Sequence, residues 1–398
     1  MLYRIVPKTG EKLSILGFGA MRLPTNKDGS INEDKAIEQM RKAIDGGVNY
    51  LDTAWPYHGG QSEIVVGKAL ANGYREKVKI ADKLPPWAIN TREDMDAILE
   101  KQLEKLGVTC IDYYLLHALE GNSWKKLNSL GVINFLESSK KEGKIANIGF
   151  SFHGTKEEFT QIIDAYDWTF CQIQYNFLDT QNQAGTAGLK YAAAKGIAIV
   201  IMEPLRGGNL SKPEAPPAIQ SLWDTARTKR LPVEWALRWV WNHPEVTVVL
   251  SGMNVDEHIA QNLTIASQAE ANSLTDTELA LINQVADTYR VLMPVGCTGC
   301  QYCMPCPAGV NIPSCFEIYN TGRMFAEPKE RTQFIYALMN GGVRGNKTYA
   351  SQCVECGQCM EQCPQHIEIP ERLKEVAAYC EVEGIVETAQ NLMAGNRH

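Results

Sequence analysis

Residues 146–174 read ANIGFSFHGTKEEFTQIIDAYDWTFCQIQ, and this stretch contains the repeating unit of the fold. Two β-branched or apolar runs, Ala146–Ser151 and Phe170–Gln174, flank a helical pattern, which is typical of a strand, a helix and a second strand. Thr155 and Glu158 have the spacing of a capping box and precede the apolar residues of that helix. The stretch therefore predicts one β-α-β unit of a parallel sheet.

The same alternation of short apolar runs and helical patterns extends from the N-terminus to about residue 265. It predicts strands at Ile15–Ala20, Val48–Thr53, Val78–Ala81, Cys110–His117, Ala146–Ser151, Phe170–Gln174, Ile197–Met202 and Val246–Leu250. Eight strands with eight helices favour an α/β fold of the closed (β/α)8 TIM barrel type. An open doubly wound sheet is the alternative, but Gly17 and Gly19 alone are too few for its dinucleotide-binding fingerprint. Thr9-Gly10, between two short extended runs, predicts a hairpin that closes the barrel floor.

The chain of 398 residues is long enough for a barrel and an additional domain. Hydrophobic residues make up 44% and charged residues 21%, as in ordinary globular proteins, so disorder is not expected. We place a barrel at residues 1–290 and a Cys-, Pro- and Gly-rich helical domain at residues 291–398. Helices are expected in that domain near Pro313–Phe325, Pro328–Asn340 and Pro370–Glu381.

The net charge of -7 argues against binding to nucleic acid or to an anionic membrane surface. A small-molecule substrate or a protein redox partner fits this charge better. No apolar stretch near the N-terminus is long enough for a signal peptide, and no segment approaches membrane-spanning length. The sequence therefore predicts a cytoplasmic protein that begins at Met1.

Eight of the 12 cysteines form two runs in the last quarter of the chain. The second run, residues 353–364, has the spacing C-x2-C-x2-C-x3-C-P, which is that of a bacterial 4Fe-4S ligand set. The first run, residues 297–307, is similar, but its last gap is one residue shorter. Clustered cysteines of this kind indicate metal ligation in a reducing compartment and not disulfides.

In this spacing the fourth cysteine of each run reaches the other cluster. We therefore assign one 4Fe-4S cluster to Cys297, Cys300, Cys303 and Cys363, and the other to Cys353, Cys356, Cys359 and Cys306. Structural zinc is the alternative, although zinc sites generally use two close cysteines per arm and not four. The two runs are too far apart for tandem hairpins, so we expect a mostly helical ferredoxin-like domain with two clusters.

Four polar residues fall at the C-terminal ends of consecutive predicted strands or in the loop that follows, where TIM barrels place their chemistry. They are Asp52, Tyr57, Lys83 and His117. Each alone would be an ordinary core or surface residue, but together they resemble the Asp, Tyr, Lys and His tetrad of the aldo/keto reductase family. The resemblance extends over the barrel, and the C-terminal domain resembles that of the subgroup with a 4Fe-4S ferredoxin-type domain.

The resemblance implies reversible reduction of a carbonyl by hydride from a nicotinamide. A free phenol holds its proton to a pKa of about 10, so Tyr57 needs help to exchange it at neutral pH. Lys83 is expected to favour the phenolate, and Asp52 to hold that ammonium in place. His117 is expected to orient the substrate oxygen and to stabilise its developing charge.

Other positions resemble the family's nucleotide contacts. Ser151 and Gln172 match residues that hold the nicotinamide carboxamide, Asn262 matches an adenine contact, and the loop after the seventh strand is a common phosphate site in barrels. That loop contains Leu205, Arg206, Gly207 and Gly208. The sequence departs from the family at Phe152, Met202, Gly252, Met253 and His258. The last three replace the polar and basic residues that usually bind a 2'-phosphate, so the choice between NADP and NAD stays open.

A hydride carries two electrons, whereas a 4Fe-4S cluster accepts one at a time. Two interpretations follow. In the first, the barrel reduces a carbonyl with NAD(P)H and the clusters are structural or exchange electrons with a separate protein such as a ferredoxin or flavodoxin. In the second, a flavin at the barrel site passes electrons between the clusters and an external carrier. A third class is a catalytically idle electron carrier or redox sensor, against which the intact tetrad argues.

Overall fold

The barrel consists of eight parallel strands that close on themselves. The structure is a computed structural model that describes residues 1–341 and 347–384. The strands are β3 (Leu16–Gly19), β4 (Tyr50–Asp52), β5 (Lys79–Leu84), β6 (Ile111–Leu119), β7 (Ile145–Phe152), β8 (Phe170–Gln174), β9 (Ala198–Met202) and β10 (Val246–Ser251). Each strand pairs with its neighbour in sequence, and β10 closes the circle by pairing with β3. All eight predicted strands and the TIM barrel are confirmed.

Short antiparallel strands β1 (Tyr3–Ile5) and β2 (Lys12–Ser14) form the predicted N-terminal hairpin. Val6 and Leu13 of this hairpin belong to the same buried cluster as the interior side chains of the barrel, among them Tyr50 and Tyr113. Burial of these apolar side chains fills the barrel, so it is a packed core and not a channel. The hairpin covers the N-terminal end of the strands and leaves the opposite end to the functional residues.

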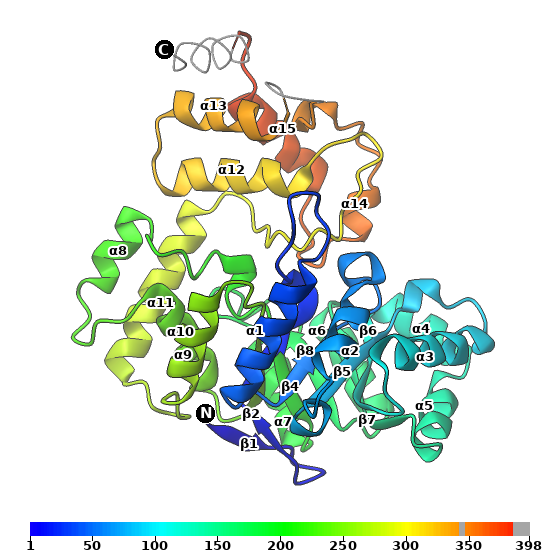
Figure 1. The fold of residues 1–398 in the computed structure, drawn as a ribbon. Helices are drawn as coiled ribbons and strands as arrows, with labels where there is room; N and C mark the ends of the chain where they lie inside the picture. Colours follow the sequence, from blue (N-terminus) through cyan, green and yellow to red (C-terminus); the bar gives the residue numbers. More distant parts are fainter. Residues whose placement is uncertain (342–346, 385–398) are drawn as a thin grey trace. The chain divides into compact units, whose positions relative to one another are not determined.

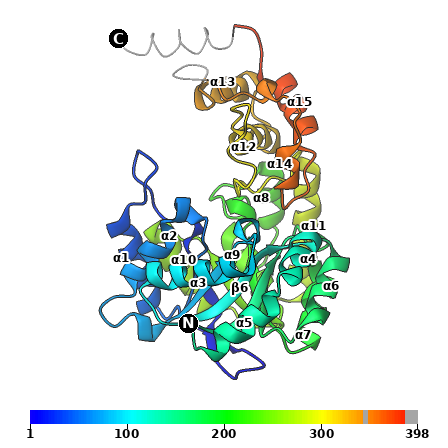
Figure 2. The ribbon, with the colours of Figure 1, turned by 90° about the vertical axis from the view of Figure 1, so that its right-hand side faces the viewer.

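Helices surround the strands and cover the outside of the barrel. They are α1 (Glu33–Asp45), α2 (Ser62–Ala69), α3 (Arg92–Leu106), α4 (Gly121–Ser129), α5 (Val132–Lys141), α6 (Lys156–Ala165), α7 (Gly185–Ala194), α9 (Pro232–Trp241) and α10 (Asp256–Ala266). The predicted capping box at Thr155 is present before α6, and Thr91 forms another before α3. In Figure 2, α1 and α2 lie on one side of the barrel and α6 and α7 on the opposite side, with β6 between them.

The chain divides into two units. The first contains Met1–Leu205 and Val233–Asp276, and the second contains Arg206–Pro232 and Thr277–His398. The loop after β9 and helix α8 (Pro217–Trp223) therefore belong to the same unit as the cysteine runs. The long helix α11 (Asp276–Leu292) leads from the barrel into the second unit.

The second unit is helical, as the sequence predicts. Its helices beyond α11 are α12 (Ile312–Met324), α13 (Lys329–Met339), the short α14 (Gln358–Glu361) and α15 (Ile369–Cys380). Helices α12, α13 and α15 contact one another, and α12 and α13 lie side by side in Figure 1. Their buried faces form a core that contains Phe316, Tyr336 and Leu373, and most of the cysteines of the two runs pack against its edge. Among the described residues, no helix has the length and the apolar character needed to cross a bilayer.

Candidate active site and cluster-binding residues

The four tetrad positions lie where three neighbouring strands end. Asp52 is the last residue of β4, Lys83 lies one residue before the end of β5, and His117 lies near the end of β6. Tyr57 begins the 3-10 helix η2 (Tyr57–Gly60), which follows β4. Because the strands are parallel and adjacent, their ends meet at one rim of the barrel.

Lys83 is completely buried and forms an ion pair with Asp52. Its Nζ donates to Oδ1 of Asp52 and to the backbone oxygen of Thr53, each at 2.7 Å. The same ammonium lies 5.1 Å from the ring centroid of Tyr57. Burial raises the pKa of Asp52, and the charge of Lys83 opposes that shift. The structure thus holds a fixed ammonium beside the phenol.

His117 faces the same phenol. The two ring centroids are 6.1 Å apart with an interplanar angle of 82°, and the ring of Trp87 lies 5.2 Å from His117. Burial, the ammonium of Lys83 and the nearby His153 hold the pKa of His117 well below its usual value, so the imidazole is neutral. Within the described part of the chain, Nδ1 of His117 has no hydrogen-bond partner. A neutral ring with a nitrogen available for a ligand can hydrogen-bond a substrate oxygen.

A backbone irregularity directs His117 into the site. The register between β6 and β7 shifts between Leu116 and Leu119, and Ala118 has a φ of 48°, which is rare for a residue with a side chain. The N–H of Ala118 donates to Oγ of Ser151 at 2.7 Å and stabilises this conformation. Bulges of this kind re-aim side chains at the rims of barrels.

The backbone of Lys83 is held from outside the barrel by buried polar residues. Its N–H donates to Oδ1 of Asp82 at 2.8 Å, and its carbonyl accepts from Nε2 of Gln102 at 2.9 Å. Gln102 also donates to Glu63 at 3.3 Å, and Lys105 forms an ion pair with Glu63 at 2.7 Å. Burial and the nearby Glu63 raise the pKa of Asp82 well above its usual range. A raised pKa favours the neutral form of the Asp82 carboxyl, while Lys105 balances the charge of Glu63.

Three predicted nucleotide contacts are buried at the ends of their strands or on the following helix: Ser151, Gln172 and Asn262. Gln172 donates from Nε2 to Sδ of Met202 at 3.7 Å, and Asn262 donates from Nδ2 to Oγ of Ser251 at 3.1 Å. In the part of the chain that the structure describes, Oε1 of Gln172 and Oδ1 of Asn262 have no partner. A buried amide oxygen without a donor costs free energy until a ligand supplies one. These two atoms therefore suit the amino groups of a carboxamide and of an adenine.

The predicted phosphate loop, which follows β9, is divided between the two units. Leu205 ends a segment of the first unit, whereas Arg206, Gly207 and Gly208 belong to the second unit. The buried Arg206 side chain donates to the backbone oxygen of Gly296 at 3.2 Å. The structure brings this loop together with the first cysteine run.

The positions that depart from the family pattern have separate environments. Phe152 is buried against Phe150 and Phe159. Met253 is buried, while Gly252 and His258 are exposed. The side chain of Arg22 lies beside Gly252, because a Cβ built on that glycine would be 3.4 Å from Cβ of Arg22.

Two residues near the barrel rim were not predicted from the sequence, Arg22 and His153. His153 lies two positions after Ser151 at the end of β7, and its Nδ1 is 3.2 Å from Oε1 of Gln183. The rule that polar residues at strand ends carry the chemistry would have found it. Arg22 has no comparable signal, because its position depends on the packing of a loop.

Among the aromatic side chains in the loops near the tetrad, Trp87 lies beside His117. Nζ of Lys105 lies 4.0 Å from the ring centroid of Trp55. Trp124 packs edge-on against Trp168, with the two ring centroids 6.0 Å apart. Nε2 of His58 accepts a hydrogen bond from the backbone N–H of Leu23 at 3.0 Å. Trp87 is therefore the aromatic residue best placed to contact a substrate.

The cysteines of the two runs form two groups of four. In each group, the first three cysteines of one run lie near the last cysteine of the other run. Burial raises the pKa of Cys303 to about 12, and the neighbouring thiols Cys300, Cys297 and Cys363 contribute to this shift. Burial likewise raises the pKa of Cys359, and its neighbours are Cys353, Cys306 and Cys356. The structure thus brings each predicted set of four together.

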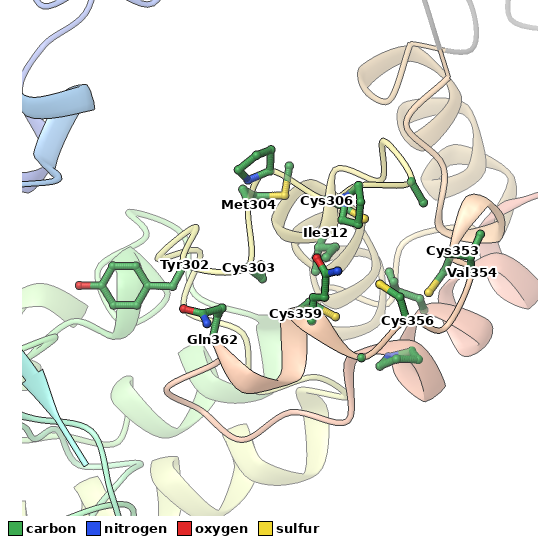
Figure 3. Close-up of a pocket in the computed structure, with 17 residues that line it drawn as sticks. Tyr302, Cys303, Met304, Cys306, Ile312, Cys353, Val354, Cys356, Cys359 and Gln362 are labelled. Atoms are coloured by element: carbon green, nitrogen blue, oxygen red, sulfur yellow. The ribbon is translucent and has the colours of Figure 1, made fainter. Parts of the chain in front are cut away.

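Cysteines of both runs line a cavity of about 110 Å³. Figure 3 shows Cys303, Cys306, Cys353, Cys356 and Cys359 around it. Ile312 and Leu373 complete an apolar wall. In residues 1–341 and 347–384, no three His, Cys, Asp or Glu side chains converge closely enough for a single metal ion. Thiols spread around an apolar cavity suit a four-iron cube better than one zinc ion.

The remaining cysteines do not join these groups. Cys171, Cys315 and Cys380 are buried, and Cys110 is partly buried. Sγ of Cys315 lies 3.4 Å from the hydroxyl of Tyr336 inside the helical core. The three buried cysteines are packing residues of their respective cores.

The family models match both parts of the chain. The aldo/keto reductase family model matches residues 15–287, and the 4Fe-4S dicluster domain model matches residues 296–368. L-galactose dehydrogenase of Arabidopsis thaliana is 26% identical over 310 residues, which cover 73% of this chain and 95% of the plant protein.

Solved structures show the same barrel. An aldo-keto reductase of Bacillus halodurans in its holo form is 25% identical and covers 72% of this chain and 96% of its own, with a TM-score of 0.60. An aldo-keto reductase of Klebsiella pneumoniae in complex with NADPH covers the same shares at 20% identity, with a TM-score of 0.57, and supports the fold alone. The chain therefore belongs to the aldo/keto reductase family of oxidoreductases and carries a 4Fe-4S dicluster domain after the barrel.

Proposed function

We propose that the barrel reduces an aldehyde or ketone to the alcohol with NAD(P)H, or catalyses the reverse oxidation. The observation that carries this proposal is the buried ion pair of Lys83 and Asp52 beside Tyr57, with the neutral His117 on the other side of the phenol. Bound nicotinamide supplies the hydride that adds to the carbonyl carbon.

Tyr57 is the proton donor in this proposal. Its phenol gives a proton to the carbonyl oxygen, and the Lys83 ammonium stabilises the phenolate that remains. Asp52 holds Lys83 in position by accepting its hydrogen bond at 2.7 Å. His117 stays neutral and holds the substrate oxygen by a hydrogen bond, so it does not compete with Tyr57 for the proton.

The nucleotide is expected to lie across three buried polar residues of the barrel. Gln172 and Ser151 are placed to hold the carboxamide, and Asn262 the adenine, because two of these side chains have buried oxygens without a donor in the described part of the chain. Arg22, beside Gly252, is a cation suited to a 2'-phosphate, which favours NADP over NAD. Leu205, which belongs to the same unit as the barrel, stays a candidate for a phosphate contact.

The second unit carries two 4Fe-4S clusters in this proposal. The first cluster is bound by Cys297, Cys300, Cys303 and Cys363, and the second cluster by Cys353, Cys356, Cys359 and Cys306. The grouping of the thiols supports this assignment. Cys356 is exposed, so the second cluster is placed to exchange single electrons with a separate carrier protein of the ferredoxin or flavodoxin kind. Thiolate-bound iron suits a reducing compartment, which supports the cytoplasm.

Steady-state oxidation of NADPH and NADH with a panel of aldehydes, ketones and aldoses tests the reductase activity. Aldoses are included because L-galactose dehydrogenase is among the relatives. Anaerobically purified protein should oxidise NAD(P)H only when a carbonyl is added. The Tyr57→Phe variant should lose this activity and keep its iron, because the ring still packs against His117. Iron-loaded protein that oxidises neither nucleotide with any substrate, or that releases a bound flavin, would contradict the proposal.

A further inference from the structure

The loop after β9 makes an unusually close contact with the first cysteine run. Gly207 has a φ of 68°, and a Cβ built on it would lie 1.9 Å from the backbone oxygen of Thr298. No side chain fits in that space, so position 207 must be glycine for the two backbones to meet. Both segments lie in the second unit.

Two side chains of this loop donate hydrogen bonds to residues 293–297, the segment that leads into the first cysteine run. Arg206, which is 7% exposed, donates from one guanidinium nitrogen to Sδ of Met293 at 2.8 Å and from another to the backbone oxygen of Gly296 at 3.2 Å. Asn209 donates to the backbone oxygen of Cys297 at 3.3 Å. The guanidinium is thus fixed one residue away from a predicted ligand of the first cluster.

A guanidinium stays protonated at any pH that a protein tolerates. Consecutive Cα atoms are about 3.8 Å apart, so a charge hydrogen-bonded to Gly296 lies within about 10 Å of the cluster that Cys297 would hold. A 4Fe-4S cluster gains one negative charge when it accepts an electron, and its potential responds to nearby charge and hydrogen bonds. A buried cation at this place stabilises the reduced form.

We propose that Arg206 raises the reduction potential of the first cluster. Arg206 then acts through its charge and its hold on the backbone near Cys297, not as a contact to a nucleotide phosphate. This inference rests on the proposed pair of clusters. It assigns Arg206, in the loop after β9, a role in electron transfer.

A redox titration of anaerobic holoprotein, followed by EPR spectroscopy, tests the inference. In the Arg206→Gln variant, the ratio of reduced to oxidised first cluster at a fixed potential should fall on the order of tenfold. This is the effect expected when a unit charge about 10 Å from the cluster is removed in a protein of effective dielectric near 20. A tenfold change corresponds to 59 mV for one electron. The second cluster should shift less than about twofold.

Matched variants separate charge from structure. Arg206→Lys keeps the charge. The ratio of reduced to oxidised first cluster at the same potential should therefore stay within about threefold of the wild-type ratio. Arg331→Gln removes an exposed arginine of α13 that pairs with Glu327, and should shift neither cluster. If Arg206→Gln does not retain its iron, Asn209→Asp places a negative charge beside Cys297 and should lower the potential of the same cluster.

Several outcomes overturn the inference. Unchanged potentials in Arg206→Gln, with both clusters retained, would show that its charge does not act on the cluster. Loss of one cluster in both Arg206→Gln and Asn209→Asp, even after anaerobic reconstitution, would make the loop a structural clamp only. A raised KM for NADPH without a shift in potential would return Arg206 to a phosphate contact. Wild-type protein without two EPR-active clusters would instead refute the proposed function.

Discussion

Replacing Lys83 by Met tests the tetrad most sharply, because the structure gives a distance from which to work. The ammonium lies 5.1 Å from the centroid of the Tyr57 ring, and both groups are buried. At an effective dielectric of about 20, two unit charges at this separation attract by about 3 kcal/mol. The Met variant loses that stabilisation of the developing phenolate, which corresponds to roughly a 10²-fold loss of kcat/KM.

The assay is carbonyl-dependent oxidation of NAD(P)H by the anaerobic protein, with iron content as a check on the second unit. The loss should appear mainly in kcat, because the ammonium interacts more strongly with the phenolate than with the phenol. Asp82→Asn is the matched control: its amide has the shape of the carboxyl, and its oxygen can still accept from the N–H of Lys83, so activity should stay within about threefold of the wild type. A Lys83→Met variant with more than about a fifth of wild-type kcat/KM would refute the assigned role of this charge.

Three further predictions concern His117, the nucleotide and the crossed ligands. Because the pKa of His117 is lowered from 6.5, the unfolded chain binds a proton below that pH that the folded chain excludes, so stability falls as the pH drops. Thermal denaturation of His117→Phe should show a weaker decline below pH 6.5 than the wild type, and equal slopes would contradict a buried neutral imidazole. Arg22→Leu should raise the KM for NADPH about tenfold with little effect on NADH, whereas parallel changes would exclude a 2'-phosphate contact. Cys306→Ser should lose the same EPR signal as Cys353→Ser and keep the signal lost in Cys297→Ser; the opposite pattern would remove the crossover.

The eight strands could be predicted because each is a short apolar run followed by a helical pattern. The strand β5 shows where this reasoning falls short. The prediction ended at Ala81, whereas the structure continues to Leu84. Asp82 and Lys83 interrupt the apolar pattern, yet both are buried. Lys83 pairs with Asp52, and Asp82 accepts a hydrogen bond from the backbone N–H of Lys83. The burial of such residues depends on partners that are distant in the sequence, and a local pattern of apolar residues does not predict those partners.

The tetrad could be placed from the sequence because strand order brings strand ends together. Its fine geometry could not. The bulge at Ala118 has no sequence signal, since alanine is not typical of a positive φ. The contact between Arg206 and Gly296 joins residues 90 positions apart, so a loop expected from barrel topology to bind phosphate also contacts the cysteine run. Contacts of such sequence separation depend on the packed structure.

The central claim is that hydride passes directly from a nicotinamide to a carbonyl carbon in a protein that also carries iron-sulfur clusters. Isotope transfer tests it most directly: holoprotein is given NAD(P)H deuterated at the transferable position, and the alcohol product is analysed by mass spectrometry. We expect the deuterium at the former carbonyl carbon. If the alcohol forms at an undiminished rate but carries no deuterium, and the label appears in water, direct transfer is contradicted. Such a result would indicate that the electrons travel through a flavin or the clusters.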